Sequence, residues 1–255
     1  MAYRRKPAEG VLNIVRFNWP FFAAAASLLL VLGGAVLLAD ATWRPWVLAA
    51  LMLTGAPLVA SLLVSYYVYD CSALYSLNWL PAECWPTAGQ TMVNIHAGFD
   101  ETSYLLLQRF PSASLRVLDF FDPTEHSEAS IRRARAADSP FHGTEPVQPH
   151  ALPLPAASVD RGFVLLAAHE IRKPTQRVAF FGELRRVLKP TGRLVVVEHL
   201  RDPANFLAYT IGFLHFYPRP MWLRTFAAAG FTPQQEIKIT PFVSAFILVP
   251  NGISD

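Results

Sequence analysis

Two long apolar runs near the N-terminus constrain this chain more than any other feature. Residues 21–39 and 46–68 contain no charged side chain, and a helix of about 20 residues crosses the hydrocarbon layer of a bilayer. The short connector between the runs carries Asp40, Arg44 and Pro45. Residues 1–69 are therefore predicted to form a transmembrane helical hairpin. The composition agrees, because 53% of the residues are hydrophobic and only 16% are charged, which is more apolar than a soluble domain requires.

Two other interpretations of these runs were weighed against the hairpin. The first run is longer than the apolar core of a cleaved signal peptide. In this chain a second apolar run also follows directly, which a signal peptide does not require. Two helices buried in a soluble protein rarely reach this length without a charged face. The hairpin is the favoured interpretation, and a lipid bilayer is the first partner that it implies.

The distribution of charge predicts the orientation of the hairpin. Arg4, Arg5, Lys6 and Arg16 precede the first run, whereas the connector holds one arginine. Basic residues stay on the cytoplasmic side, so we expect an inner (cytoplasmic) membrane protein with two spans and with the N- and C-termini in the cytoplasm. The remainder of the chain has equal numbers of acidic and basic residues. Such a domain offers no basic surface for nucleic acid, and no protein partner is predicted.

After the apolar runs, the pattern changes twice. Residues 70–92 carry Tyr75, Trp79 and Trp85, which indicates an amphipathic helical linker at the headgroup level. Residues 93–255 alternate short apolar runs with helical stretches, and this alternation predicts an α/β domain with ligands at the carboxyl ends of parallel strands. The last two runs are joined by a short reverse connection, so they form an antiparallel hairpin that closes five parallel strands.

Motifs in the second half of this domain resemble a known family. Leu152–Pro155 and Val159–Asp160 precede one apolar run, and Arg186–Gly192 (RVLKPTG) precedes the next. Residues 91–249 are similar in this respect to class I S-adenosylmethionine-dependent methyltransferases, particularly those that modify quinones and other small molecules. The resemblance implies a Rossmann-like seven-stranded sheet and S-adenosylmethionine as cofactor. The N-terminal hairpin lies outside it.

The resemblance also implies where the cofactor binds: at the turn after the first strand, at the end of the second, and beside Leu152 and Pro153. The turn departs from the family, because the stretch VNIHAGFD keeps only Gly98 of three expected glycines. Asn94 and Asp100 are open to two roles, cofactor contact or helix capping. The candidate cofactor-binding residues are Asn94, His96, Ala97, Gly98, Asp100, Asp119, Phe120, Leu152 and Pro153.

Methyl transfer from a sulfonium is an in-line displacement, so alignment is the main requirement and a base is optional. His169 follows the fourth strand, where the family faces the methyl group, and is the best candidate base. Glu170 beside it is an alternative. His199, at the end of the fifth strand, is a further catalytic candidate. The competing interpretation of His169 is a histidine that hydrogen-bonds the backbone or orients a substrate.

Aromatic residues after the fifth strand are candidates for the acceptor pocket. The functional interpretation is an apolar pocket that opens toward the bilayer, and the alternative is a helix that packs on the core or rests on the membrane. The remaining histidines, His96, His126, His142 and His150, show no metal-ligand spacing, so no metal site is predicted. The candidate substrate residues are Tyr209, Phe213, His215, Phe216 and Tyr217.

These observations predict a membrane-anchored methyltransferase that modifies a lipophilic or membrane-associated small molecule. A hairpin holds the cleft near a bilayer and raises the effective concentration of an acceptor dissolved in it. The alternative is a catalytically inactive, methyltransferase-like binding or scaffold protein at the membrane, which the missing glycines favour. A nicotinamide-dependent reductase fits poorly because its glycine fingerprint is absent.

Overall fold

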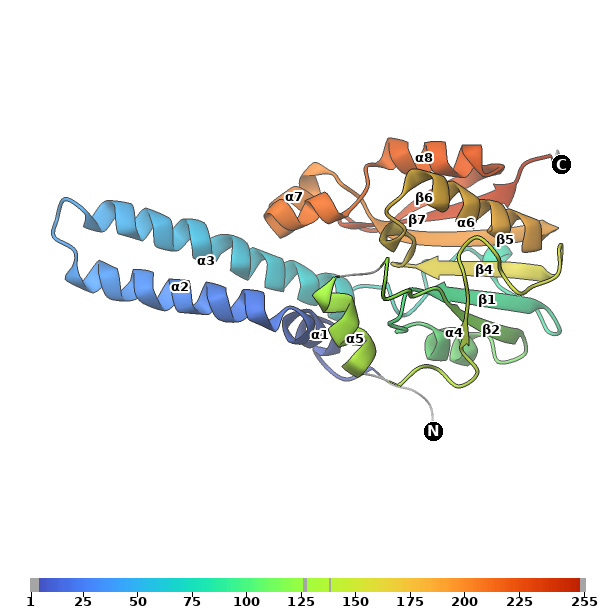
Figure 1. Cartoon of the computed structure of the whole chain (residues 1–255), viewed down its shortest axis with the longest axis horizontal. Coiled ribbons are helices and arrows are strands. Elements are labelled where there is room, and N and C mark those ends of the chain that lie inside the picture. The colour runs from blue at the N-terminus through green and yellow to red at the C-terminus, as the bar shows by residue number, and fades with distance from the viewer. Residues whose placement is uncertain (1–4, 126–127, 138, 253–255) are drawn as a thin grey trace.

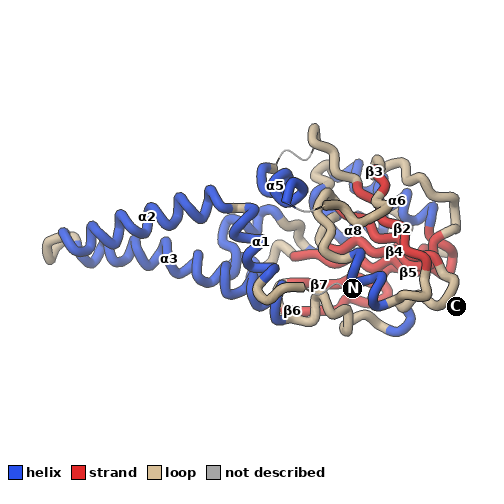
Figure 2. The backbone as a smooth tube through the Cα atoms, turned by 90° about the horizontal axis from the view of Figure 1, so that it is seen from below, coloured by secondary structure: helices blue, strands red, loops and turns tan. Residues whose placement is uncertain are grey.

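A long helical hairpin extends from one end of an α/β domain (Figure 1). The computed structural model describes residues 5–125, 128–137 and 139–252, so Arg4 and His126 lie outside the described residues. The hairpin consists of α2 (Trp19–Leu38) and α3 (Arg44–Tyr66), which lie side by side in both views (Figures 1 and 2). Both are long and apolar enough to cross a membrane, and in the most apolar stretch of each no residue is buried. Their exposed leucines have no protein to pack against.

A short helix that the sequence did not predict precedes the hairpin. This helix, α1 (Glu9–Phe17), begins where the Asp70 carboxylate accepts the backbone N–H groups of Gly10 (2.8 Å) and Val11 (2.9 Å). A carboxylate is favourable there because it satisfies free donors and meets the positive end of the helix dipole. A Cβ on Gly10 would lie 2.3 Å from the Cβ of Tyr69, so only glycine allows this close approach.

The α/β domain is built on one seven-stranded sheet, which confirms the predicted fold class. The strand order is β3-β2-β1-β4-β5-β7-β6, with β1 to β5 parallel and β6 and β7 antiparallel to their neighbours. The strands are β1 (Thr91–His96), β2 (Ser114–Asp119), β3 (Glu145–Pro146), β4 (Val159–Leu165), β5 (Leu188–His199), β6 (Phe231–Thr240) and β7 (Val243–Pro250).

Two apolar layers cover the sheet. On one face, Phe180 and Phe181 pack with Trp222 and Phe226 in a continuous buried cluster. On the other, segments before β1 pack against Val195 and Val197 of β5. Helices α6 (Pro174–Val187) and α8 (Arg219–Ala228) cover the first face, and α4 (Ser103–Arg109) lies on the second. Helix α5 (Ala129–Ala137) packs beside α1, and α7 (Pro203–Tyr209) packs beside α3.

The segment between the hairpin and the sheet corrects one prediction. Residues 70–92 do not form an amphipathic helix: a π-turn, η1 (Tyr67–Cys71), is followed by turns and by the 3₁₀ turn η2 (Ala82–Cys84). Leu74, Leu77 and Leu80 are buried against the sheet. Tyr75 and Trp79, on which the prediction of a membrane-surface helix rested, instead pack against the buried cluster on this face of the sheet.

Candidate active site

The turn after β1 is shaped by its single glycine. Gly98 adopts a φ of 88°, and a Cβ there would lie 2.9 Å from the ring of Phe121. An L-residue is disfavoured at this φ, and the contact adds a steric reason for glycine. His96 and Asp100 stand where the family turn has its other two glycines, and Asp100 together with Asn94 holds the turn from within.

Asn94 and Asp100 supply these internal contacts. The amide of Asn94 donates to the hydroxyls of Ser103 (2.8 Å) and Thr102 (2.9 Å). One oxygen of Asp100 accepts the backbone N–H groups of Thr102 (3.0 Å) and Ser103 (2.9 Å), and so caps the start of α4. The other oxygen of Asp100 and the carbonyl oxygen of Asn94 are buried without a partner. Capping is therefore the visible role of both residues, with one acceptor atom of each still open.

His96 ends β1 between two carboxylates and bonds to neither. Its Nε2 lies 3.9 Å from Asp100 and its Nδ1 lies 3.8 Å from Asp119, which is too long for a hydrogen bond. Both ring nitrogens are buried without a partner among the described residues. Burial outweighs the two carboxylates and lowers the pKa of His96 below its usual 6.5. A buried neutral imidazole with two unpaired nitrogens is costly unless a polar ligand meets it.

Asp119 ends β2 and is already partly engaged. Arg135 of α5 forms an ion pair with one oxygen, and the backbone N–H of Phe121 donates to the other (2.9 Å). An ionised carboxylate has about four acceptor positions, so both contacts leave room for hydroxyl donors. Asp119 therefore fits the ribose-binding role that the resemblance implies.

Two cavities flank the turn after β1. The larger, about 230 Å³, extends from His96 and Ala97 to Leu165 and Ala167 at the end of β4. The smaller, about 100 Å³, lies between Gly98 and Asp119. The side chains of the turn therefore leave space on both sides. The residues present fit a nucleoside cofactor, because unpaired polar atoms face open volume at the edge where this fold binds ligands.

Helix α1 and its junction with α2 form one wall of the larger cavity. Ile14, Phe17 and Asn18, at the junction of α1 and α2, line it together with Trp79. Phe17 packs edge-on against Phe99 of the β1 turn, with ring centroids 5.1 Å apart. The sequence did not identify these residues, because they belong to the predicted anchor and meet the cleft only through the fold.

The remaining cofactor candidates, Phe120, Leu152 and Pro153, lie away from the two cavities beside the β1 turn. Phe120 is buried and lines a third cavity, of about 220 Å³, next to Glu170. Leu152 is buried in the core, and its backbone N–H donates to Glu183 (2.9 Å). Neither Leu152 nor Pro153 is among the described residues that line these three cavities, so their cofactor role remains a prediction.

At the end of β4, the 3₁₀ turn η3 (Ala168–Glu170) holds two candidate catalytic residues. The ring of His169 contacts the fully buried Glu198 of β5 through Nδ1 (2.7 Å) and faces Glu170 through Nε2 (3.3 Å). Burial opposes the charge on His169, but Glu198 and Glu170 outweigh it and raise its pKa to about 10. Burial likewise opposes the charge on Glu170, but His169 and His215 hold its pKa well below its usual range.

His199 has a different environment from His169. Its Nε2 accepts from the hydroxyl of Tyr69 (2.8 Å), and its Nδ1 faces the carbonyl of Phe242 (3.0 Å). The residue is buried, and its ring stacks on Phe216 with centroids 4.7 Å apart. Burial lowers the pKa of His199 to about 4. Both ring nitrogens are thus hydrogen-bonded, and the bond to Tyr69 links β5 to the segment that follows α3. A catalytic role for His199 stays a prediction.

The predicted substrate residues divide into two groups. His215, at the end of η4 (Thr210–His215), reaches the cluster of His169 and Glu170 and lies 3.5 Å from Glu170. Phe216 lies edge-on to His169 (6.4 Å between centroids). By contrast, Phe213 packs on Phe206, Tyr217 packs on Arg177 and Trp222, and Tyr209 packs edge-on to His199. Only the first two therefore contact the cluster at the end of β4.

The sheet order and the antiparallel closing strands give a Rossmann-like domain, the fold that the resemblance to class I methyltransferases implied. Residues 121–196 match the protein family described as methyltransferase domain. These findings confirm the resemblance to class I methyltransferases, the class for which S-adenosylmethionine is the cofactor.

Two curated relatives agree with this class. The chain is 31% identical over 146 residues to the ubiquinone/menaquinone biosynthesis C-methyltransferase UbiE of Roseobacter denitrificans, covering 56% of this chain and 55% of that one. It is 30% identical over 135 residues to the enzyme of the same name from Paracoccus denitrificans, covering 52% and 50%. The chain thus spans about half the length of the curated relatives it matches.

Among solved structures, a SAM-dependent methyltransferase from Aquifex aeolicus is similar over 76% of this chain and 98% of that chain, with a TM-score of 0.48 and 15% identity.

Proposed function

We propose that this protein is a membrane-anchored, S-adenosylmethionine-dependent methyltransferase that acts on a lipophilic small molecule. The observation that carries the proposal is a polar set at the end of β1 that lacks partners among the described residues. His96 and Asp100 line open volume at the carboxyl edge of the sheet, and the side-chain oxygen of Asn94 is buried beside them. A cofactor with an amino and a carboxylate group would satisfy these atoms.

The chain's own residues have distinct roles in this proposal. Asn94 and His96 bind the amino-acid end of the cofactor, and Asp119 accepts the ribose hydroxyls. The bound cofactor supplies the methyl group as an electrophile. Glu170 lines the cavities on both sides of η3, so Glu170 and His169 form the wall beside the acceptor. His169, held protonated between two carboxylates, orients an acceptor oxygen rather than removing its proton.

The lining of the larger cavity supports a lipophilic acceptor. Ile14, Phe17, Leu74 and Trp79 give it an apolar side at the base of the hairpin. An acceptor dissolved in the bilayer would reach this side without crossing water, and the hairpin would keep the cleft at the membrane surface. The names of the two curated relatives, which refer to quinone biosynthesis, also support a lipophilic acceptor.

Activity is tested on the full chain reconstituted in lipid nanodiscs. Incubation with methyl-labelled S-adenosylmethionine and a lipid extract should yield a labelled apolar product that mass spectrometry detects. Asp119→Asn should lower the yield by about tenfold, because it weakens charge-assisted hydrogen bonds to the ribose. Glu145→Gln is the matched control, since Glu145 lies on the neighbouring strand β3 and pairs with Arg116. Absence of any labelled product would contradict the proposed activity.

The orientation of the hairpin is tested by cysteine labelling. Thr42→Cys introduces a thiol in the exposed connector, and Cys71 is exposed at the other end of the hairpin. A membrane-impermeant maleimide should label the connector in intact cells and Cys71 only after permeabilisation. The reverse result would contradict the predicted orientation, and labelling of neither site would contradict the span.

Two observations favour the inactive alternative. Arg135 already pairs with Asp119, and the turn keeps one glycine. Under that alternative the protein binds neither S-adenosylmethionine nor its demethylated product, and Asp119→Asn leaves its cellular function intact.

A further inference from the structure

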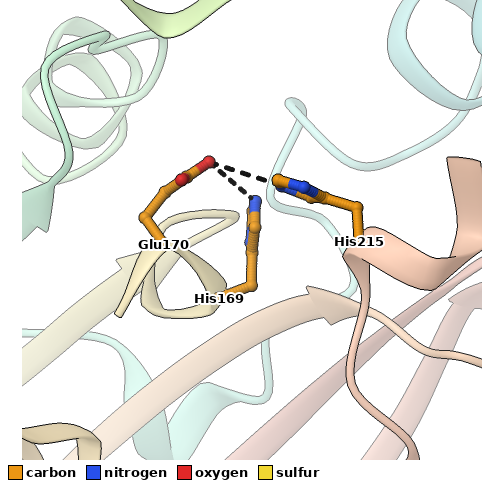
Figure 3. A group of neighbouring side chains, drawn as sticks. All are labelled: His169, Glu170 and His215. Carbon is orange, nitrogen blue, oxygen red and sulfur yellow. Dashed lines mark ion pairs between the residues drawn. The ribbon is translucent and has the colours of Figure 1, made fainter. Parts of the chain in front are cut away.

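Two adjacent side chains and a third that is distant in the sequence converge beside the candidate cleft. His169 and Glu170 come from η3, and His215 comes from the end of η4 (Figure 3). One oxygen of Glu170 lies 3.3 Å from Nε2 of His169 and 3.5 Å from Nε2 of His215. One ligand atom from each residue lies within 4.8 Å of the others. Donor atoms bound to one zinc ion at about 2.0–2.1 Å are separated by similar distances.

Each histidine of this set has a carboxylate on its other ring nitrogen. Glu198 lies 2.7 Å from Nδ1 of His169, and Glu128 lies 3.3 Å from Nδ1 of His215. A carboxylate at Nδ1 fixes the ring so that Nε2 faces inward, and metal-binding histidines almost always have such a partner. The repetition of this arrangement on two histidines from different elements is the second observation that points to an ion.

We propose that His169, Glu170 and His215 bind a divalent transition-metal ion of the zinc type. Two imidazoles and one carboxylate suit zinc, whereas magnesium and calcium prefer oxygen ligands alone. Three protein ligands leave a coordination position open, as in catalytic rather than structural zinc sites. Glu170 lines cavities on both sides of η3, so the open position is next to the volume proposed for the acceptor.

One neighbouring cation opposes the ion. A terminal nitrogen of Arg172 lies 2.5 Å from Nδ1 and 2.8 Å from Nε2 of His215. The same nitrogen lies 2.9 Å from Glu128, so the guanidinium keeps a carboxylate partner when it moves off the imidazole. Arg172 therefore competes with the ion, and its removal should strengthen binding.

An ion on Nε2 of His169 would replace the proton that the metal-free cluster holds there, and the ion would then stabilise an anionic oxygen of an acceptor in place of the imidazolium. Metal binding itself does not require the proposed methyltransferase activity. Zinc binding is measured on the purified full chain after treatment with a chelator, by competition with a chromophoric chelator, and Co²⁺ gives an absorption spectrum that reports ligand number and type. We expect one ion per chain and a cobalt spectrum of tetrahedral character. Neither readout requires cofactor or turnover, so failure here leaves the proposed function standing.

Variants assign the ion to this cluster. His215→Ala and Glu170→Gln should each weaken zinc binding by about a hundredfold, and Glu128→Gln by about tenfold. His215 is partly exposed, so its loss should leave the fold intact. Arg172→Gln should tighten binding. His150→Ala is the matched control, because His150 lines the adjacent cavity outside the set and should leave affinity unchanged. The proposal is overturned if no ion binds or if binding survives both ligand variants.

Discussion

His96 and His169 occupy the same edge of the sheet, yet their surroundings are opposite. His96 is buried between two carboxylates that it does not reach, and its pKa is lowered. His169 is held by Glu198 and Glu170, and its pKa is raised to about 10. At the end of β1, the ring nitrogens of His96 lack hydrogen-bond partners among the described residues, and a ligand could supply them. At the end of β4, the charge on His169 is already balanced by Glu198 and Glu170. On this difference we base the proposal of a cofactor side at the end of β1 and an acceptor side at the end of β4.

The largest expected effect comes from removing the compensated histidine. His169→Leu leaves Glu198 fully buried without its cationic partner, which should lower the free energy of unfolding by about 3 kcal/mol. His96→Leu removes a ring without hydrogen bonds and should change stability by less than about 1 kcal/mol. Urea denaturation of both variants in the absence of metal measures the contrast. Equal losses for the two histidines would break the comparison.

Gly98→Ala should show the next largest effect, because Gly98 shapes the cofactor side. The φ of 88° and the contact with Phe121 together should cost about 2 kcal/mol. Gly143→Ala is the matched control: Gly143 has a φ of 83°, but no atom lies within 4 Å of an added Cβ. The two melting temperatures therefore separate backbone strain from the collision with Phe121. A Gly98 variant as stable as the Gly143 variant would show that Phe121 moves away freely.

Affinity for the cofactor should distinguish the cofactor side from the acceptor side. His96→Leu should weaken binding of S-adenosylhomocysteine by about tenfold, because polar groups of the ligand lose their partner in a buried site. Arg172→Gln, on the acceptor side, should leave this affinity within about twofold. Fluorescence titration of each variant tests the assignment. If His96→Leu binds as tightly as the wild type, His96 does not contact the cofactor.

The smallest expected effect is a pH dependence of stability from the cofactor side. The folded-state pKa of His96 lies below its usual 6.5, so the unfolded chain takes up this proton first as the pH falls. The stability from His96 is present above about pH 6.5 and is lost as the pH falls through the lowered value, by at most about 1.4 kcal/mol per unit. His199, with a pKa of about 4, acts in the same direction. His96→Leu should therefore reduce the acid slope in urea titrations without abolishing it, and an unchanged slope would contradict the assigned environment.

The sequence predicted the parts of this molecule that depend on local patterns. Apolar length marked both hairpin helices, and the residues Arg186–Gly192 marked the entry into β5. The resemblance also indicated that Asp119 would end β2, as it does. β3 contains only two residues, Glu145–Pro146, and so has no pattern of its own.

The missed parts of the site depend on contacts between distant segments. No local pattern pairs Glu198 with His169, but β5 places the Glu198 carboxylate against the His169 ring. Phe17 was assigned to the anchor, but α1 folds back and brings it to the β1 turn. Neither spacing nor composition encodes such pairs, because each forms only when two elements pack together. The same reason explains why no metal-ligand spacing indicated His169, Glu170 and His215.

Calorimetric titration of the full chain in lipid nanodiscs with S-adenosylhomocysteine tests the central claim most directly. The cavities beside His96 and Asp119 predict saturable binding at one site per chain, with no binding of a nicotinamide dinucleotide under the same conditions. Absence of heat and of saturation with S-adenosylhomocysteine, in protein whose folding is verified by circular dichroism, would contradict the claim that this edge of the sheet binds the methyl donor.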